Sequence, residues 1–109
     1  MTTEEFIKSI SLEGEEWRDV VGFEGYYIVS NFGRVASLPR KNRRTTIMKE
    51  TLNHEGYISM CLCKDGKSFK ERLHRIIAKA WIPNPNNYTC IEHLDACRTN
   101  NSISNLRLV

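Results

Sequence analysis

Alternating apolar and polar positions predict two β-hairpins in the first two thirds of the chain. The first covers residues 26–38 and turns at Asn31-Phe32-Gly33, while Ile47-Met48 adds a further short strand. The second covers residues 56–72 and turns at Asp65-Gly66, a dipeptide that favours a tight hairpin when it lies between alternating runs. On this hairpin we expect a buried face formed by Ile58, Met60 and Leu62.

A helical period replaces the alternation at residues 73–81 and predicts the best helix of the chain, with one apolar stripe of Leu73, Ile76, Ile77, Ala80 and Trp81. Pro83 and Pro85 then end it. His74 lies off the stripe and is either a second residue of a catalytic site or a histidine that packs or caps. A short helix is also predicted for residues 2–10, where Thr2 and Glu5 form a capping box.

The last twenty residues contain most of the side chains that could take part in a chemical reaction. Residues 90–93 and 105–109 alternate like two short strands, and polar turn formers separate them. This predicts a hairpin with His93 near one strand end and Asn105 near the other.

Such a hairpin has the groups for phosphodiester hydrolysis. His93 would take a proton from water, Glu92 would hold a hard divalent cation, and Asn105 would orient the imidazole. The alternative is a histidine and a glutamate that form an ordinary solvated surface pair.

The pattern of His93-Leu94-Asp95, Asn100-Asn101 and Asn105-Leu106 resembles the HNH motif of phage and intron-encoded homing endonucleases. Upstream, residues 17–38 resemble the nuclease-associated modular DNA-binding (NUMOD) module that precedes HNH in that family. The resemblance covers about residues 15 to 109. It implies an α+β fold, duplex DNA as the partner, Mg²⁺ or another divalent cation as the cofactor, and a phage or mobile-element source.

Three positions depart from the family pattern. Glu92 stands where Asp or Asn is usual, and Ala96 replaces a glycine at a position that favours positive φ. The family fold is ββα, and the sequence ends at Val109 before the helix that brings the remaining metal ligand. The C-terminal helix is therefore expected to be missing.

Charge is mildly basic overall, with a net charge of +3, but its distribution is uneven. Residues 34–49 contain six basic side chains and no acidic one, which is typical of a phosphate-binding segment or of a solvated loop. With the family's DNA-facing sheet and the exposed face of the second helix, the expected DNA contacts are Tyr26, Arg34, Ser37, Arg40, Lys41, Arg43, Arg44, Arg75 and Lys79.

The four cysteines, Cys61, Cys63, Cys90 and Cys97, do not have the spacing of common zinc knuckles. Free thiols are expected and zinc is not favoured, although a zinc-stabilised binding module stays an alternative. The N-terminus has neither a basic start nor an apolar signal core, and no apolar run is long enough to span a bilayer, so a cytoplasmic protein is expected in the bacterial host cell.

The sequence therefore predicts an α+β protein with a small antiparallel sheet, one packed helix and a C-terminal HNH-like hairpin, a truncated ββα-metal motif. We expect an N-terminal extension over residues 1–14, a NUMOD-like sheet module over 15–70, and the helix with the HNH-like motif over 71–109. The implied function is an HNH-type DNA endonuclease that nicks or cleaves duplex DNA. The alternative is an inactive derivative that binds DNA or binds and inhibits a host protein.

Overall fold

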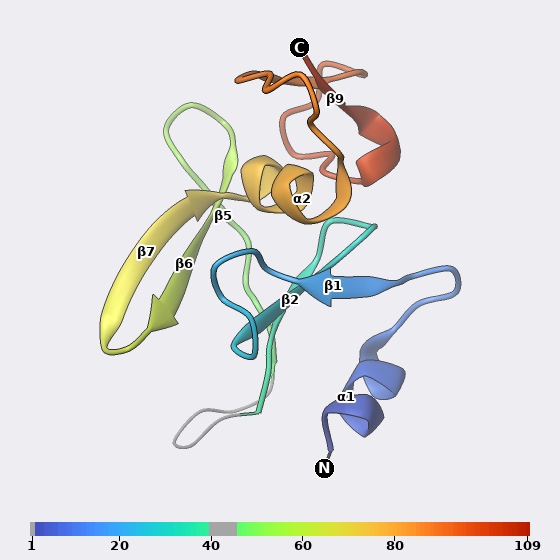
Figure 1. Cartoon of the computed structure of the whole chain (residues 1–109), viewed down its shortest axis with the longest axis vertical. Coiled ribbons are helices and arrows are strands. Elements are labelled where there is room, and N and C mark those ends of the chain that lie inside the picture. The colour runs from blue at the N-terminus through green and yellow to red at the C-terminus, as the bar shows by residue number, and fades with distance from the viewer. Residues whose placement is uncertain (1, 40–45) are drawn as a thin grey trace.

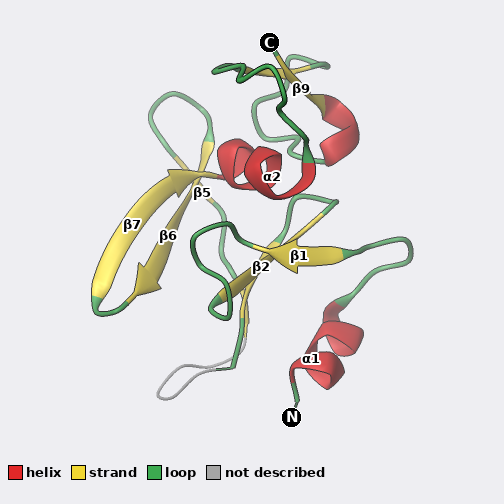
Figure 2. Cartoon of the chain, in the orientation of Figure 1, coloured by secondary structure: helices red, strands yellow, loops and turns green. Residues whose placement is uncertain are grey.

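The computed structural model describes residues 2–39 and 46–109, with helices and short strands arranged around one central helix (Figures 1 and 2). In chain order the elements are α1 (Thr3–Ile10), β1 (Trp17–Asp19), β2 (Tyr27–Ser30), β3 (Val35–Ser37), β4 (Thr46–Ile47), β5 (Thr51–Leu52), β6 (Ile58–Lys64), β7 (Lys67–Arg72), α2 (Leu73–Trp81), β8 (Ile91–His93), a 3-10 turn η1 (Ile103–Asn105) and β9 (Leu106–Leu108). In the described residues the strands form three antiparallel sheets, ordered β1-β2-β3-β4, β5-β6-β7 and β8-β9. The predicted α+β fold is confirmed, with three small sheets in place of one.

The first sheet is buried on both faces along β2. Tyr27 and Val29 pack into the main apolar cluster with α2, whereas Ile28, which points to the other face, packs with Phe6 of α1. All four residues of β2 are buried, as expected for a strand covered on two sides. The predicted hairpin over residues 26–38 is confirmed by the pairing of β2 with β3.

The second predicted hairpin is formed by β6 and β7, which pair from Ser59 opposite Arg72 to Lys64 opposite Lys67. Asp65 and Gly66 both have positive φ, 54° and 75°, as a type I′ turn requires. The three expected inward residues, Ile58, Met60 and Leu62, are buried.

Helix α2 joins the three sheets. Its apolar stripe is buried at Leu73, Ile76 and Ile77, and the helix contacts β1 and β2 of the first sheet, β6 and β7 of the second, and β8 and β9 of the third. Figure 1 shows it between the two larger sheets and the C-terminal hairpin. The helix spans the residues that its apolar period predicted.

Helix α1 is capped as expected, because Thr2 Oγ1 accepts a hydrogen bond from the Glu5 N–H at 3.1 Å. It docks on the face of the first sheet opposite α2 through Phe6, which contacts a small cluster with Ile28, Ala36 and Leu38. Neither helix in the described residues has the length and apolarity needed to span a bilayer.

Candidate functional site

His93 ends strand β8 and faces the interior of the molecule. In β8, Ile91 packs against the main apolar cluster, and His93 is two residues further on the same face, where it meets α2. Glu92 lies between them and points to the opposite face, directly across from Arg107 on β9. The alternation of a strand therefore separates the acid from the histidine that follows it.

The imidazole of His93 is held by Asn101. The His93 Nε2–H donates to Asn101 Oδ1 at 2.8 Å, and Asn101 is only 4% exposed. The expected partner was Asn105, and that expectation is wrong: the loop between the strands returns Asn101 to the imidazole, while Asn105 turns toward the loop. The adjacent amides Asn100-Asn101 were the signal in the sequence that pointed to this second candidate.

Asn105 closes the loop instead. Its Oδ1 accepts from the Asp95 N–H at 3.1 Å, and its Nδ2 donates to Asp95 Oδ1 at 2.9 Å and to the Asn100 carbonyl at 2.8 Å. Asn100 Nδ2 and the Cys97 N–H also donate to the Asp95 carboxylate. These donors hold the pKa of Asp95 below its usual value, with the Asn100 amide as the largest cause. Ala96 has φ +61°, so the expected positive φ is confirmed.

Two aromatic side chains adjoin His93 and were not grouped with it by the sequence. The ring centroid of His74 on α2 lies 5.3 Å from that of His93, and Tyr57 lies 4.9 Å from His74 and 6.1 Å from His93. Burial, with smaller contributions from the nearby His93, Arg75 and Arg72, lowers the pKa of His74 to about 4. His74 is therefore a neutral packing partner at neutral pH. Its Nδ1 and Asn101 Nδ2 are buried without a hydrogen-bond partner in the described structure.

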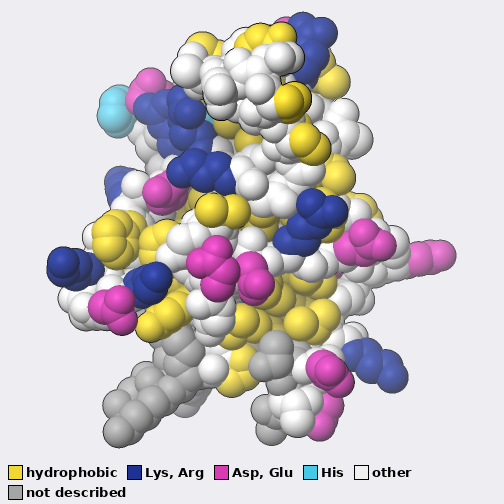
Figure 3. All heavy atoms as spheres, viewed as in Figure 1, with side chains coloured by type: hydrophobic (Ala, Val, Ile, Leu, Met, Phe, Trp, Pro, Cys, Tyr) yellow, Lys and Arg dark blue, Asp and Glu magenta, His cyan; other side chains and the backbone are white. Residues whose placement is uncertain are grey.

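Two guanidinium groups lie close to the Tyr57 ring. Arg98 lies 4.7 Å and Arg72 lies 5.2 Å from the ring centroid. Arg98 also donates to the Glu55 carbonyl, and Arg72 forms an ion pair with the Glu55 carboxylate at 2.8 Å. Figure 3 shows Lys and Arg side chains gathered where the loop after β5 approaches the C-terminal hairpin. Sequence reasoning missed this cluster because Arg72, Tyr57 and Arg98 lie on three separate segments.

Glu92 forms an ion pair with Arg107 across the hairpin, with 2.5 Å between Oε2 and the guanidinium nitrogen. Both side chains are largely exposed. In residues 2–39 and 46–109, no three or more His, Cys, Asp or Glu side chains are grouped so that they could hold a metal ion. Three of the cysteines are exposed and Cys63 is half-buried, and none of the four forms a disulfide among the described residues.

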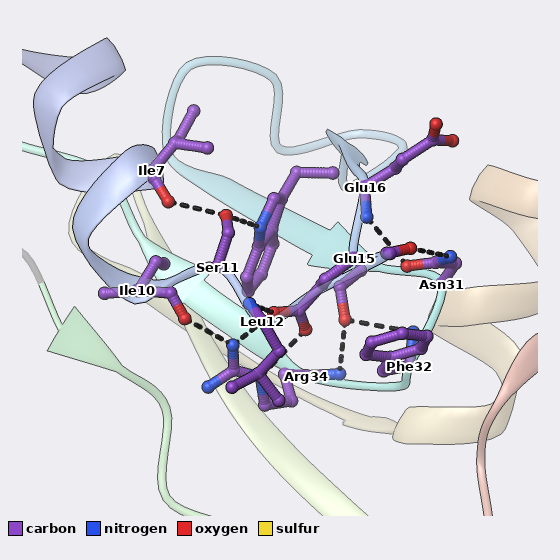
Figure 4. A network of polar contacts seen from close by, with 12 residues as sticks. Ile7, Ile10, Ser11, Leu12, Glu15, Glu16, Asn31, Phe32 and Arg34 are labelled. Atoms are coloured by element: carbon purple, nitrogen blue, oxygen red, sulfur yellow. Dashed lines mark hydrogen bonds and ion pairs between the residues drawn. The ribbon is translucent and has the colours of Figure 1, made fainter.

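Two of the expected DNA contacts on the first sheet are turned inward, which corrects their assignment. Ser37 is fully buried. Arg34 donates from Nε to Glu15 Oε2 at 2.8 Å, pairs with Glu15 Oε1 through its other nitrogen, and donates to the Ile10 carbonyl at 2.7 Å (Figure 4). Burial, the largest single cause, would raise the pKa of the Glu15 carboxyl, but the hydrogen bonds with Arg34, the Leu12 N–H and Ser30, together with the charge of Arg34, outweigh it and the pKa is lowered. Arg34 therefore ties the first sheet to the end of α1.

The other expected contacts have mixed outcomes. Tyr26 is half-buried and donates to Asp65 at 3.2 Å. Arg75 and Lys79 are exposed on α2, where they border a groove that Tyr88 and Ile91 also line. The four remaining residues, Arg40, Lys41, Arg43 and Arg44, lie outside the described residues.

Comparison with known proteins gives the relatives of this chain. Residues 15–63 match the NUMOD4 motif. The DNA endonuclease I-HmuI of Bacillus phage SP01 is 35% identical over 94 residues, which is 86% of this chain and 52% of that protein. The chain is thus homologous to the HNH homing endonuclease I-HmuI and carries the NUMOD4 motif. An uncharacterized HNH endonuclease, L245 of Acanthamoeba polyphaga mimivirus, is 31% identical over 73% of this chain and 23% of its own length.

The fold agrees with that relationship. A solved structure described as DNA binding and cleavage by the HNH homing endonuclease I-HmuI superimposes with a TM-score of 0.74 at 34% identity. The alignment covers 86% of this chain and 52% of the I-HmuI chain. The chain thus spans about half the length of this relative, so the activity of the whole relative is a separate question.

Proposed function

We propose that this chain acts on duplex DNA as an HNH-type endonuclease in which His93 is the general base. The observation that carries the proposal is the hydrogen bond between His93 Nε2 and Asn101 Oδ1 at 2.8 Å. Because the amide oxygen can only accept, this bond keeps the proton on Nε2 and leaves the lone pair on Nδ1. Nδ1 is then the atom that takes a proton from water as it attacks the phosphodiester.

Glu92 is the residue that would hold the cation. A carboxylate oxygen suits Mg²⁺, which binds through one or two carboxylates together with waters and substrate phosphates. Arg107 now occupies that carboxylate, so binding of the cation requires this exposed ion pair to open. A bound divalent cation would stabilise the charge that develops on the leaving oxygen.

DNA would approach along the basic side chains near His93. The guanidinium groups of Arg98 and Arg72 lie 4.7 Å and 5.2 Å from the Tyr57 ring centroid, and this ring is itself close to the imidazole. Guanidinium groups suit phosphate because they offer several donors in one plane. The proposed phosphate contacts also include Arg75, Lys79, the four basic residues between 40 and 44, and Tyr26, which directly precedes β2.

A second candidate function is binding without cleavage, to DNA or to a host protein that the chain inhibits. The pairing of Glu92 with Arg107 favours it, because the proposed metal ligand already has a counter-ion. Among the described residues, no three or more His, Cys, Asp or Glu side chains are grouped so that they could hold a metal ion.

Nicking of supercoiled plasmid in Mg²⁺ or Mn²⁺ tests the proposal, with His93→Ala as the test variant. Loss of a general base lowers the rate by about 100-fold or more. His54→Ala is the matched control, because that imidazole is almost fully exposed and its ion-pair partner is Glu55 at 3.9 Å. We expect wild type and His54→Ala to nick at equal rates.

Equal nicking by His93→Ala and wild type would overturn the assignment of the base. If no protein nicks, fluorescence anisotropy with labelled duplex DNA separates the remaining outcomes. Binding to DNA without nicking would support the second candidate function, and absence of binding would exclude DNA as the partner of this chain.

A further inference from the structure

The turn between β2 and β3 contacts the loop that carries Asn101. The Ile103 N–H donates to the Asn31 carbonyl at 3.0 Å, and Ser102 Oγ lies 3.5 Å from the same oxygen. Gly33 has φ +89°, and a Cβ there would lie 2.8 Å from the Asn101 carbonyl oxygen and 3.0 Å from its carbonyl carbon. The two segments meet backbone to backbone, with no room for a side chain.

The turn is also anchored from its other side. Asn31 Oδ1 accepts from the Glu16 N–H at 2.8 Å, and Asn31 Nδ2 donates to the Gly14 carbonyl at 3.1 Å (Figure 4). Within the turn, Ser30 Oγ accepts from the N–H groups of Phe32 and Arg34. Fixed at both ends, the turn is a rigid surface for the loop that rests on it.

Asn101 connects this surface to the imidazole. Its backbone carbonyl touches Gly33, and its side chain holds His93 Nε2 at 2.8 Å. We propose that Gly33, in the segment that matches the NUMOD4 motif, is a positioning residue that acts through Asn101 on the tautomer and placement of His93. The inference rests on the proposed function, because the placement of His93 matters for catalysis only if His93 is the general base.

The contact between Gly33 and Asn101 leaves no room for an added side-chain atom. If Gly33 were replaced by alanine, the Asn101 backbone would have to move by several tenths of an ångström to reach ordinary van der Waals distance from the new Cβ. The His93–Asn101 hydrogen bond depends steeply on distance and angle, so such a shift weakens it. Without the bond, the proton distributes between the two imidazole nitrogens, and fewer molecules have Nδ1 free to act as a base. Small misplacements of reacting groups cost up to about 100-fold in rate.

The experiment compares Gly33→Ala with Gly22→Ala. An alanine would meet nearly the same backbone strain at both positions, because φ is +89° and +88°, but nothing lies within 4 Å of a Cβ at Gly22. The difference between the variants therefore isolates the contact with Asn101. The first readout is the pair of imidazole ¹⁵N chemical shifts of His93 at fixed pH, assigned with His93→Ala.

We expect the Nε2–H tautomer in wild type and Gly22→Ala, and averaged ¹⁵N shifts in Gly33→Ala. The second readout is plasmid nicking at saturating DNA, where kcat should fall about 10-fold or more in Gly33→Ala alone, with the Kd for DNA within about 2-fold of wild type. Identical ¹⁵N shifts and kcat in the two variants would overturn the inference. Because the ¹⁵N shifts need no cleavage, they test it even if wild type does not nick.

Asn31→Ala is the milder variant if Gly33→Ala does not fold. It removes the two side-chain anchors at Glu16 and Gly14 but leaves the Asn31 carbonyl that Ile103 uses. We expect a smaller movement of the His93 ¹⁵N shifts in the same direction as in Gly33→Ala. Unchanged shifts in a folded Asn31→Ala protein would count against the turn as the positioning device.

Discussion

The forces that stabilise the first sheet differ from those that stabilise the C-terminal hairpin. All four residues of β2 are buried, and the strand has an apolar cluster on each face. In β8 no residue is fully buried, and the twelve-residue connection to β9 closes through side-chain amides and one carboxylate. The segment that resembles a DNA-binding module is thus stabilised by burial, whereas the segment with the proposed base is stabilised by directed polar contacts.

The two regions therefore differ in how well they tolerate small displacements. Burial is non-directional, so a core strand keeps its place as long as its apolar side is covered. A hydrogen-bonded loop depends on distances and angles, so a small displacement can remove its support. His93 lies where the two regions meet, between α2 and Asn101, and it depends on both.

The largest effect is expected from a cavity in the apolar region. Leu62→Ala removes a side chain with 0% exposure from the main cluster, and such changes cost about 2–5 kcal/mol of unfolding free energy. Leu52→Ala is the matched control, because Leu52 lies in the same sheet with 61% exposure and should cost less than about 0.5 kcal/mol. Urea unfolding measures both. Equal losses would mean that burial does not distinguish these two positions.

A smaller and more local effect is expected in the polar region. Asn105→Ala removes one acceptor and two donor contacts that join Asp95, Asn100 and Asn105. The cost is about 1–2 kcal/mol, because Asp95 is exposed and water replaces part of what is lost. Hydrogen exchange should accelerate at the Asp95 and Cys97 amides while the amides of β6 keep their rates.

Asn86→Ala is the control for that change, since Asn86 is exposed and makes no hydrogen bond in the described part of the chain. If exchange in β6 accelerates together with the loop in Asn105→Ala, the two regions do not open separately, and the contrast between them fails.

How far the sequence could predict the molecule follows the same division. The β2–β3 and β6–β7 hairpins and α2 were predictable because alternation, an Asp-Gly turn and a 3.6-residue stripe each encode burial locally. Which amide holds His93 was not, because both Asn101 and Asn105 can reach across a polar loop and only the folded backbone selects one. Arg34 was wrongly predicted as a DNA contact for a related reason. A basic residue beside a basic run gives no sign that it pairs with a buried Glu15 nineteen residues upstream.

The smallest effect concerns a residue whose conformation the sequence did predict. Ala96 has φ +61°, a region that costs an L-residue about 1–2 kcal/mol and glycine little. Ala96→Gly also adds freedom to the unfolded chain, which offsets about 0.5–1 kcal/mol, so the net gain in unfolding free energy should be below about 1 kcal/mol. Ala80→Gly in α2 is the control and should destabilise by about 1 kcal/mol, because the helix gives glycine no compensating relief. If both variants lose the same stability in urea, the positive φ at Ala96 carries no strain, and the polar loop is less constrained than its hydrogen bonds indicate.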